Sequence, residues 1–113
     1  MTFEFKASVT VTTFNRKEQL KNVLAALDGQ QGRFSDSFEV LVADDGSTDG
    51  AEDLVNGLIA ERSYRYPLRY FNTHLTHVFG AGMARNLGIR NARGEYLLFI
   101  DDDCMPHRRW VYR

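Results

Sequence analysis

The stretch Gly94–Cys104, GEYLLFIDDDC, decides the fold of this chain. Its centre, Tyr96–Ile100, is apolar at every position, which is typical of a strand buried on both faces in a parallel sheet between helices. The three carboxylates of Asp101–Asp103 follow directly. Adjacent carboxylates repel one another, so ionising all three is costly unless a positive group lies nearby. A divalent cation held by oxygen ligands is one such group, and a solvated acidic turn is the alternative.

Length and composition describe one domain, or part of one, with a modest core. The 113 residues are 43% hydrophobic, as in ordinary globular proteins. Fourteen Lys and Arg balance fifteen Asp and Glu to a net charge of -1, so nothing favours nucleic-acid binding. The single cysteine, Cys104, excludes an internal disulfide and a cysteine-rich zinc site. No signal peptide or membrane segment is recognisable, so we expect a cytoplasmic protein, peripheral membrane association of a longer protein being left open.

Three strand–helix units precede the quoted stretch. β-branched and apolar runs predict strands over Ala7–Thr13, Phe38–Ala43 and Pro67–Phe71. Helical spacing of apolar residues predicts a helix after each of the first two strands, and a third helix over Met83–Asn91. The expected buried faces consist of Leu20, Val23, Leu24 and Leu27 in the first helix and Leu54, Val55, Leu58 and Ile59 in the second.

The helix starts carry capping residues. Asn15, with Glu18 three residues later, predicts a capping box for the first helix. Ser47 or Thr48 is expected to cap the second helix, because both follow the tight turn that the glycine after two aspartates predicts.

The order β-α-β-α-β-α-β with short crossovers predicts an α/β fold. We expect an open, doubly wound, Rossmann-like sheet, mostly parallel, with helices on both faces. Such sheets bind ligands outside the carboxyl ends of their strands, at a switch in strand order. Polar clusters follow three of the predicted strands, at Thr12–Asn15, Asp44–Ser47 and Asp101–Asp103. We therefore expect these clusters to converge on one edge of the sheet.

The motifs also resemble a known family. TTFNR (12–16), ADDGSTD (43–49) and GAGMARNLGIRNARGEYLLFIDDDC (80–104) together resemble the nucleotide-sugar half of family 2 glycosyltransferases, which have the GT-A fold. The resemblance covers essentially the whole chain. It implies metal-dependent, inverting transfer of a sugar from a nucleotide diphosphate sugar to an acceptor hydroxyl. A UDP-sugar is the donor it favours, with thymine or guanine donors also occurring in the family; neither the sugar nor the acceptor is readable.

The resemblance implies nucleotide-binding residues in TTFNR, in ADDGSTD and in the ARN segment (84–86) of the third motif. Thr13 and Phe14 lie where the family lines the base pocket, in the same motif as Asn15 and Arg16. Asp44 lies where a carboxylate accepts a hydrogen bond from the uracil imide. The remaining assignments are Asp45, for the turn or the ribose, and Arg85, whose guanidinium would neutralise the acidic cluster or the diphosphate.

The acidic triplet resembles the family's D-x-D motif. By this resemblance Asp103 is a direct ligand of Mn²⁺ or Mg²⁺. Asp101 and Asp102 hold the metal's waters or the ribose hydroxyls, and Asp101 is also a candidate metal ligand. The cation stabilises the leaving nucleoside diphosphate.

Two departures from the family pattern bear on the prediction. Thr12 stands where the family often has proline, which should perturb the turn little. The family's catalytic base lies beyond the metal motif, and this chain ends at Arg113. We therefore predict that residues 1–113 are the nucleotide-sugar-binding part of a longer transferase, truncated before its acceptor half and inactive alone. Apolar surface and an unpaired edge at the last strand would then favour a homodimer or aggregation.

Other function classes remain open from the sequence alone. A non-catalytic nucleotide-binding module would have the same residues. A receiver-like signalling domain and an acidic-triplet phosphatase fit less well, because both place acids after the first strand, where this chain has TTFNR. The remaining residues of interest are expected to be structural: Cys104 in the core, Trp110 and Tyr112 in packing, and His74, His77, His107, Arg62, Arg65, Arg69, Arg108 and Arg109 at the surface.

Overall fold

A computed structural model describes residues 4–29, 37–73 and 82–104. The predicted alternation of strands and helices is confirmed there. In chain order the elements are β1 (Phe5–Thr13), α1 (Lys17–Asp28), β2 (Phe38–Asp44), α2 (Ala51–Glu61), β3 (Leu68–Asn72), α3 (Gly82–Asn91) and β4 (Gly94–Asp101). The predictions made for His74, His77, His107, Arg108, Arg109, Trp110 and Tyr112 fall outside the described residues.

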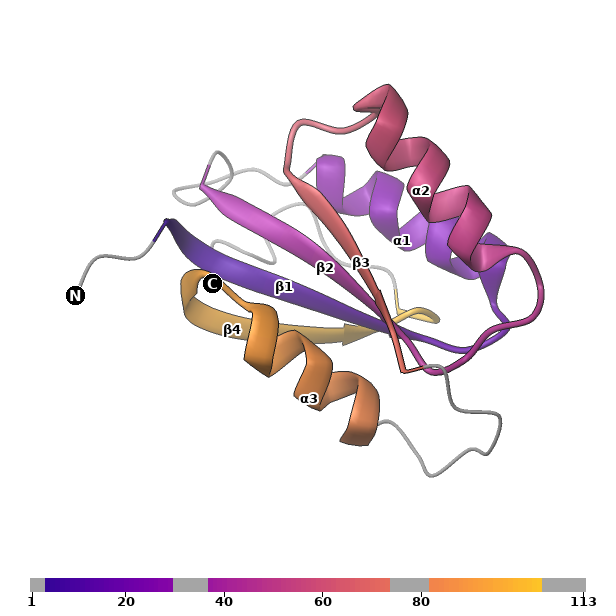
Figure 1. Cartoon of the computed structure of the whole chain (residues 1–113). Helices are drawn as coiled ribbons and strands as arrows, with labels where there is room; N and C mark the ends of the chain where they lie inside the picture. Colours follow the sequence, from indigo (N-terminus) through magenta and orange to yellow (C-terminus); the bar gives the residue numbers. More distant parts are fainter. Residues whose placement is uncertain (1–3, 30–36, 74–81, 105–113) are drawn as a thin grey trace.

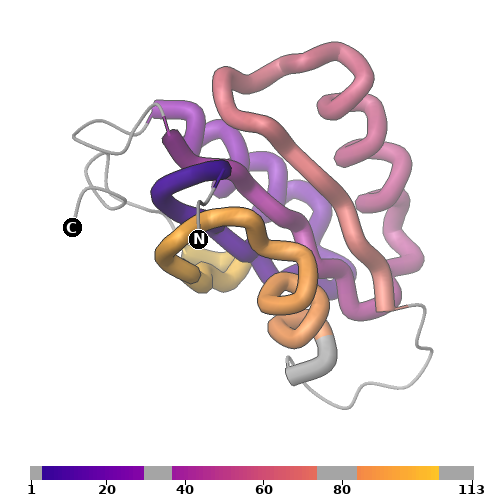
Figure 2. The backbone as a smooth tube through the Cα atoms, turned by 60° about the vertical axis from the view of Figure 1, so that its left-hand side comes forward, coloured from indigo at the N-terminus to yellow at the C-terminus, as the bar shows by residue number. Residues whose placement is uncertain are grey.

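The four strands form one parallel sheet in the order β3-β2-β1-β4. The chain moves outward from β1 through β2 to β3, then crosses to the other side of β1 to form β4. The strand order therefore switches between β1 and β4. Helices α1 and α2 cover one face of the sheet and α3 covers the other, as Figure 1 and Figure 2 show from two directions. The predicted doubly wound α/β fold is confirmed.

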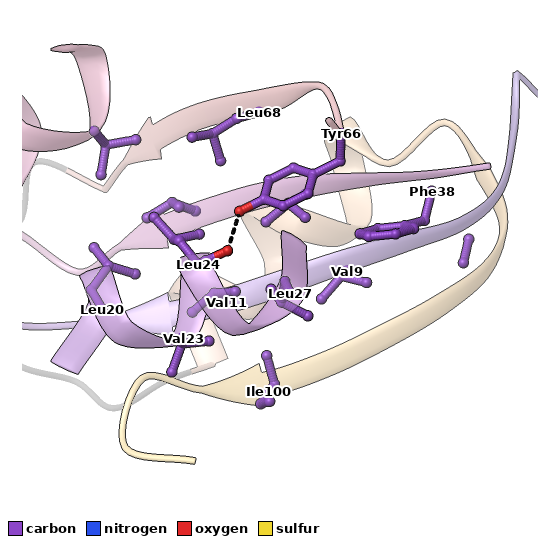
Figure 3. Close-up of a cluster of buried hydrophobic side chains, with 14 of the residues drawn as sticks. Val9, Val11, Leu20, Val23, Leu24, Leu27, Phe38, Tyr66, Leu68 and Ile100 are labelled. Atoms are coloured by element: carbon purple, nitrogen blue, oxygen red, sulfur yellow. Dashed lines mark hydrogen bonds between the residues drawn. The ribbon is translucent and has the colours of Figure 1, made fainter. Parts of the chain in front are cut away.

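The apolar core lies between the sheet and α1 (Figure 3). The predicted face of α1 is fully buried and packs on Val9, Val11 and their neighbours in β2. Burying side chains of this size contributes about 1.5–3 kcal/mol each. Tyr66 belongs to this core. Its hydroxyl donates to the Leu24 carbonyl oxygen at 2.6 Å, and its ring centre lies 5.5 Å from that of Phe38.

Helix α2 is less deeply seated than its sequence predicts. Val55 is fully buried and so is Ala51 at the helix start. The other predicted core residues of this helix, Leu54, Leu58 and Ile59, are only partly buried. No helix within ranges 4–29, 37–73 and 82–104 has the length and apolarity needed to cross a membrane.

The prediction that the strand over Tyr96–Ile100 is buried on both faces is wrong. β4 pairs only with β1 and forms an edge of the described sheet. Tyr96, Leu97 and Phe99 are 55%, 43% and 36% exposed, whereas Ile100 is buried in the core. Leu97 and Phe99 lie on the face of β4 opposite Ile100, and the helix on that face, α3, packs over β2, β1 and β3. Cys104, predicted in the core, is likewise exposed just after this strand.

The predicted helix caps are also corrected by the structure. Asn15 has φ 51° and precedes the N-cap residue of α1, Arg16, which makes no capping side-chain bond. α2 begins three residues after Thr48, behind Gly50, whose φ of 91° is left-handed. Its first turn is capped from outside by Asp49, whose Oδ1 accepts a hydrogen bond from the Ala51 N–H at 3.1 Å.

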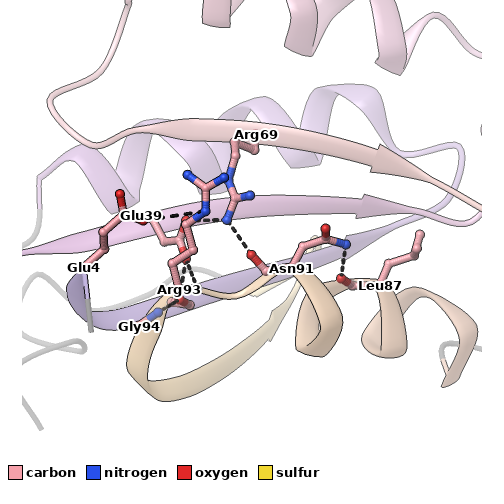
Figure 4. A network of polar contacts seen from close by, with 8 residues as sticks. Glu4, Glu39, Arg69, Leu87, Asn91, Arg93 and Gly94 are labelled. Atoms are coloured by element: carbon pink, nitrogen blue, oxygen red, sulfur yellow. Dashed lines mark hydrogen bonds and ion pairs between the residues drawn. The ribbon is translucent and has the colours of Figure 1, made fainter. Parts of the chain in front are cut away.

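A buried polar network anchors the amino ends of the strands (Figure 4). Glu39, 1% exposed, accepts hydrogen bonds from Ser8 Oγ at 2.6 Å and from the backbone N–H of Arg93 at 2.6 Å. Arg69 donates to Glu39 Oε1 at 2.7 Å and to the Asn91 carbonyl oxygen at 2.6 Å. Arg69 is therefore a partner of a buried charge, in contrast to the predicted surface charge, whereas Arg62 and Arg65 are exposed as predicted.

This network holds the junction of α3 and β4 against the sheet. Gly94, the first residue of β4, donates to Ser8 Oγ at 2.8 Å. A Cβ at this position would come within 2.5 Å of the Ala7 backbone, so only glycine allows the approach. The position of β4, and with it the acidic triplet, thus depends on contacts at the opposite end of the sheet.

Candidate functional site

The carboxyl ends of all four strands lie in a row at one edge of the sheet. Asn72 pairs with Asp44, which pairs with Thr13, and the preceding residue Thr12 pairs with Asp101. The ladder continues past the strand ends, because Asp45 N–H donates to Thr13 O at 3.0 Å. The predicted convergence of the three polar clusters is confirmed.

Threonines at the end of β1 bind the carboxylates of Asp101, the last residue of β4, and of Asp102, the residue after it. Thr12 Oγ1 donates to Asp101 Oδ1 at 2.8 Å, and Thr13 Oγ1 donates to Asp102 Oδ2 at 2.8 Å. Successive side chains point to opposite faces of a strand, so the two hydrogen bonds lie on either side of the sheet edge. Both pairs bridge β1 and β4, the two strands between which the strand order switches.

Asp102 and Asp103 differ in burial. Asp102 is 6% exposed, and this burial raises the pKa of its carboxyl group above the ordinary value. The charge of Asp103 adds to the rise, whereas the Thr13 hydroxyl, the Arg16 guanidinium and the Phe14 N–H act against it. The Asp103 side chain is 56% exposed and reaches solvent.

Among the described residues, the counter-charge of these two acids is Arg16. Its Nη1 lies 3.3 Å from Asp103 Oδ2 and 3.9 Å from Asp102 Oδ1. Arg85, for which the sequence predicts a neutralising role, instead has its guanidinium 5.9 Å from the centre of the exposed Phe99 ring on β4. It lies on α3, which covers the opposite face of the sheet from α1.

Asp44 is fully buried at the end of β2. Its Oδ2 accepts a hydrogen bond from the Tyr70 hydroxyl at 2.6 Å, and its Oδ1 accepts one from the Ser47 N–H at 2.9 Å. Both oxygens therefore have protein donors. Burial, followed by the hydrogen bond to Asp44, raises the pKa of Tyr70 above its ordinary value. Sequence reasoning missed Tyr70, whose only signal is a strand register that the sequence does not reveal.

Asp45 has a more open carboxylate. Thr73 Oγ1 donates to Asp45 Oδ1 at 3.2 Å. Its other oxygen, Oδ2, has no donor within the part of the chain that the structure describes, although the residue is only 6% exposed. Asp45 thus has an oxygen without a donor among the described residues, whereas Asp44 is 0% exposed with a donor on each oxygen.

Hydrogen bonds tie the loop after β1 to the loop after β2. The Asn15 N–H donates to Ser47 Oγ at 2.8 Å, and Asn15 Oδ1 accepts from the Thr48 N–H at 2.7 Å. The Lys17 N–H donates to Asp49 Oδ2 at 2.9 Å. These bonds occupy the polar groups of Asn15 and hold the neighbouring Phe14, which is 38% exposed, at the sheet edge.

The acidic residues fit a divalent cation only if other ligands complete its coordination. Within ranges 4–29, 37–73 and 82–104, no group of three or more His, Cys, Asp or Glu side chains is placed to hold a metal ion. Asp101 and Asp103 are exposed carboxylates two residues apart. Mg²⁺ sites of this kind use one or two carboxylates together with phosphate oxygens and water. The residues therefore fit a cation that a bound diphosphate helps to hold.

A separate groove lies at the other end of β3. It has a volume of about 410 Å³ and is lined by nine residues between Leu58 and Leu68, Tyr64 and Tyr66 among them. It begins at the end of α2, where β3 starts, whereas the polar clusters lie where β3 ends. None of the predicted site residues lines it.

A doubly wound parallel sheet with threonines and carboxylates at its switch point is the architecture of Rossmann-like α/β domains. The particular family follows from comparison with known proteins. The sequence model described as Glycosyl transferase family 2 matches residues 8–113, so the chain belongs to this family. This membership rules out the receiver-like and phosphatase alternatives.

Individual relatives agree with the family. YfnE of Bacillus subtilis, an uncharacterized glycosyltransferase, is 38% identical over 106 residues, which are 94% of this chain and 25% of YfnE. The solved structure of S. aureus TarS 1-349 in complex with UDP is 31% identical with a TM-score of 0.77, covering 94% of this chain and 30% of that one. The chain thus spans a quarter to a third of the length of these relatives.

A second solved structure is equally similar. The mannosyltransferase PcManGT from Pyrobaculum calidifontis, in complex with GDP-Man and Mn²⁺, is 29% identical with a TM-score of 0.76. The match covers 95% of this chain and 30% of that one. The GT-A fold expected from the resemblance is confirmed by these neighbours.

Proposed function

We propose that residues 1–113 form the donor-binding part of a metal-dependent, inverting glycosyltransferase. Its donor is a nucleotide diphosphate sugar, a UDP-sugar in the first place, and its acceptor is a hydroxyl group. The observation that carries the proposal is the set of carboxylates and Arg16 gathered at the switch point of a family 2 chain. UDP is bound in the structure of S. aureus TarS, and GDP-Man with Mn²⁺ in that of PcManGT, which supports this donor class.

The nucleoside would lie over the loop after β1. The exposed Phe14 ring offers a flat apolar face to a base, and the buried Thr13 precedes it as the last residue of β1. We assign the acceptor of the base N–H to Asp45, although the sequence favours Asp44 for this role. The reason is that Asp44 is fully buried and each of its oxygens already accepts a hydrogen bond within the protein, whereas one oxygen of Asp45 accepts none from the described residues. Asp44 and Asn15 then hold the shape of the two loops.

The ribose and the diphosphate would lie along the acidic triplet. Asp102, whose carboxylate accepts a hydrogen bond from Thr13, would accept hydrogen bonds from ribose hydroxyls. Asp103, with Asp101, would hold Mn²⁺ or Mg²⁺, which when bound neutralises negative charge on the leaving nucleoside diphosphate. Arg16 and Arg85 supply further positive charge for the phosphates.

The catalytic base would lie outside this chain's donor site. The carboxylates at this site each have a structural or binding role above, so none is free to deprotonate an acceptor hydroxyl; they are Asp44, Asp45, Asp101, Asp102 and Asp103. We therefore propose that residues 1–113 bind the donor but do not transfer sugar alone. A cytoplasmic location stays a prediction from the sequence.

Calorimetric titration of UDP into the protein tests the donor site. We expect binding with Mn²⁺ present, little binding with EDTA, and loss of the Mn²⁺-dependent part in Asp103→Ala. Glu61→Ala, an exposed change at the far end of α2, is the matched control and should bind as the unaltered chain does. Absence of UDP and GDP binding in every condition would overturn the proposal. Robust sugar transfer by these 113 residues would overturn the assignment of the base to another part.

A further inference from the structure

Arg16 combines a fixed backbone with a free side chain. The backbone N–H groups on either side of it, those of Asn15 and Lys17, are hydrogen-bonded to the loop after β2. Its own carbonyl oxygen accepts the first bond of α1 from the Leu20 N–H at 2.9 Å. The side chain is nevertheless 50% exposed. The guanidinium can therefore move between partners while its attachment point stays in place.

In the free protein this guanidinium neutralises the acids that the proposed function gives to the metal and the ribose. It lies 3.3 Å from Asp103 and 3.9 Å from Asp102, and Asp102 is almost completely buried. A divalent cation approaching Asp103 would meet the positive charge of Arg16 at close range. The cation must therefore displace the guanidinium, which lowers its affinity for the free protein.

A nucleoside diphosphate favours the cation over Arg16 at Asp103 in two ways. Its oxygens supply ligands that the protein lacks, since no group of three metal-binding side chains exists among the described residues. The same phosphates offer Arg16 a new anionic partner, to which a guanidinium can donate two hydrogen bonds. Both effects favour the same exchange: Arg16 releases Asp103, and Asp103 then binds the cation.

We propose that Arg16 is an exchangeable counter-ion that occupies the acids until a nucleotide binds, so that the divalent cation and the nucleotide enter the site together. The inference rests on the proposed function. It assigns Arg16 a role in the free protein as well as in the nucleotide complex. By thermodynamic reciprocity, UDP raises the affinity for Mn²⁺ by the same factor by which Mn²⁺ raises the affinity for UDP.

Titration of the protein with Mn²⁺, following the electron paramagnetic resonance signal of free Mn²⁺, tests this role without any activity assay. Without UDP, we expect Arg16→Gln to bind Mn²⁺ about fivefold more tightly than the unaltered chain, as loss of one ion pair implies. With UDP present, the variant should show a smaller coupling between UDP and Mn²⁺. Arg16→Lys keeps the charge and should keep weak Mn²⁺ binding in the free protein.

Arg62→Gln is the matched control, because it removes another exposed arginine, at the C-cap of α2. It should leave Mn²⁺ binding unchanged. The inference would be overturned if Arg16→Gln and the unaltered chain bind Mn²⁺ equally tightly without UDP. It would also be overturned if the unaltered chain binds UDP but has the same Mn²⁺ affinity with and without it. If the unaltered chain binds no nucleotide at all, the proposed function fails. Tighter Mn²⁺ binding by Arg16→Gln would then still show that Arg16 competes for the acids.

Discussion

At the scale of single residues, the buried carboxyl group of Asp102 makes the stability of the protein depend on pH. Its carboxyl group is buried, and its pKa is raised mainly by that burial. The folded protein therefore holds the Asp102 proton more tightly than the unfolded chain does. Stability is lost as the pH rises from the unfolded pKa, near 3.8, through the higher folded value, because ionisation is then favoured in the unfolded chain.

We expect Asp102→Asn to raise the free energy of unfolding at pH 7, because the amide needs no buried charge and its oxygen still accepts the Thr13 bond. The gain should shrink at pH 4, where Asp102 of the unaltered chain approaches its neutral form. Urea denaturation at the two pH values measures this. Glu61→Gln, at an exposed position, should change little at either pH. A variant less stable than the unaltered chain at pH 7 would show that Thr13 and Arg16 outweigh the cost of burial.

The remaining site residues show how partners are chosen at this scale. Asn15 fits the sequence pattern of a helix cap, yet its side chain binds Thr48 in another loop. Asp44 and Asp45 are adjacent in sequence, yet their hydrogen bonds differ. Tyr70 donates to Asp44 Oδ2, whereas Asp45 Oδ2 has no donor among the described residues. Local sequence could place these residues at strand ends but could not assign their partners, which lie about thirty residues away along the chain.

At the scale of elements, the packing of α3 depends on Gly88. Its Cα faces the Thr10 side chain on β1, and a Cβ there would overlap the Thr10 hydroxyl and methyl groups. Glycine normally weakens a helix by about 1 kcal/mol relative to alanine. The close approach to the sheet outweighs that cost here.

We therefore predict opposite results for alanine at Gly88 and at Gly57, which both lie inside helices. We expect Gly88→Ala to lower the free energy of unfolding by about 1–3 kcal/mol, as overpacking does in other cores. Gly57→Ala in α2 is the matched control, because nothing lies within 4 Å of its Cβ position. That change should stabilise the protein by about 0.4–1 kcal/mol. Urea denaturation of both variants measures the difference, and stabilisation by Gly88→Ala would contradict the close packing of α3 on β1.

At the scale of the whole molecule, β4 leaves one edge of the described sheet unpaired. The exposed side chains of Tyr96, Leu97 and Phe99 flank that edge. An edge strand that is both apolar and exposed favours pairing with another strand. A second copy of this chain, which presents the same edge, is the partner we expect in a purified sample.

We therefore predict concentration-dependent self-association of residues 1–113 in sedimentation velocity experiments. Leu97→Lys should weaken it, because a lysine on an edge strand opposes edge-to-edge pairing. Asn56→Lys, which adds the same charge at an exposed position of α2, should leave it unchanged. A chain that sediments as a monomer at high concentration would contradict the prediction.

The sequence by itself determined the order of strands and helices, the doubly wound fold and the edge at which the polar clusters meet. These follow from local patterns: apolar periodicity, β-branched runs, and carboxylates or threonines placed directly after strands. The acidic triplet at the end of β4 and the threonine motif at the end of β1 were recognisable for the same reason. Such signals lie within short stretches of chain and survive whatever the stretches pack against.

Only the tertiary structure decided which groups are buried and which are free. The continuous apolar run of β4 became an exposed edge, because β4 pairs only with β1 and α3 packs over the other three strands. Arg69 became the partner of buried Glu39, and Arg16, far from the triplet in sequence, became its counter-charge. Burial and electrostatic pairing depend on residues brought together across the sheet, and those distances are set by register and helix placement that no local pattern encodes.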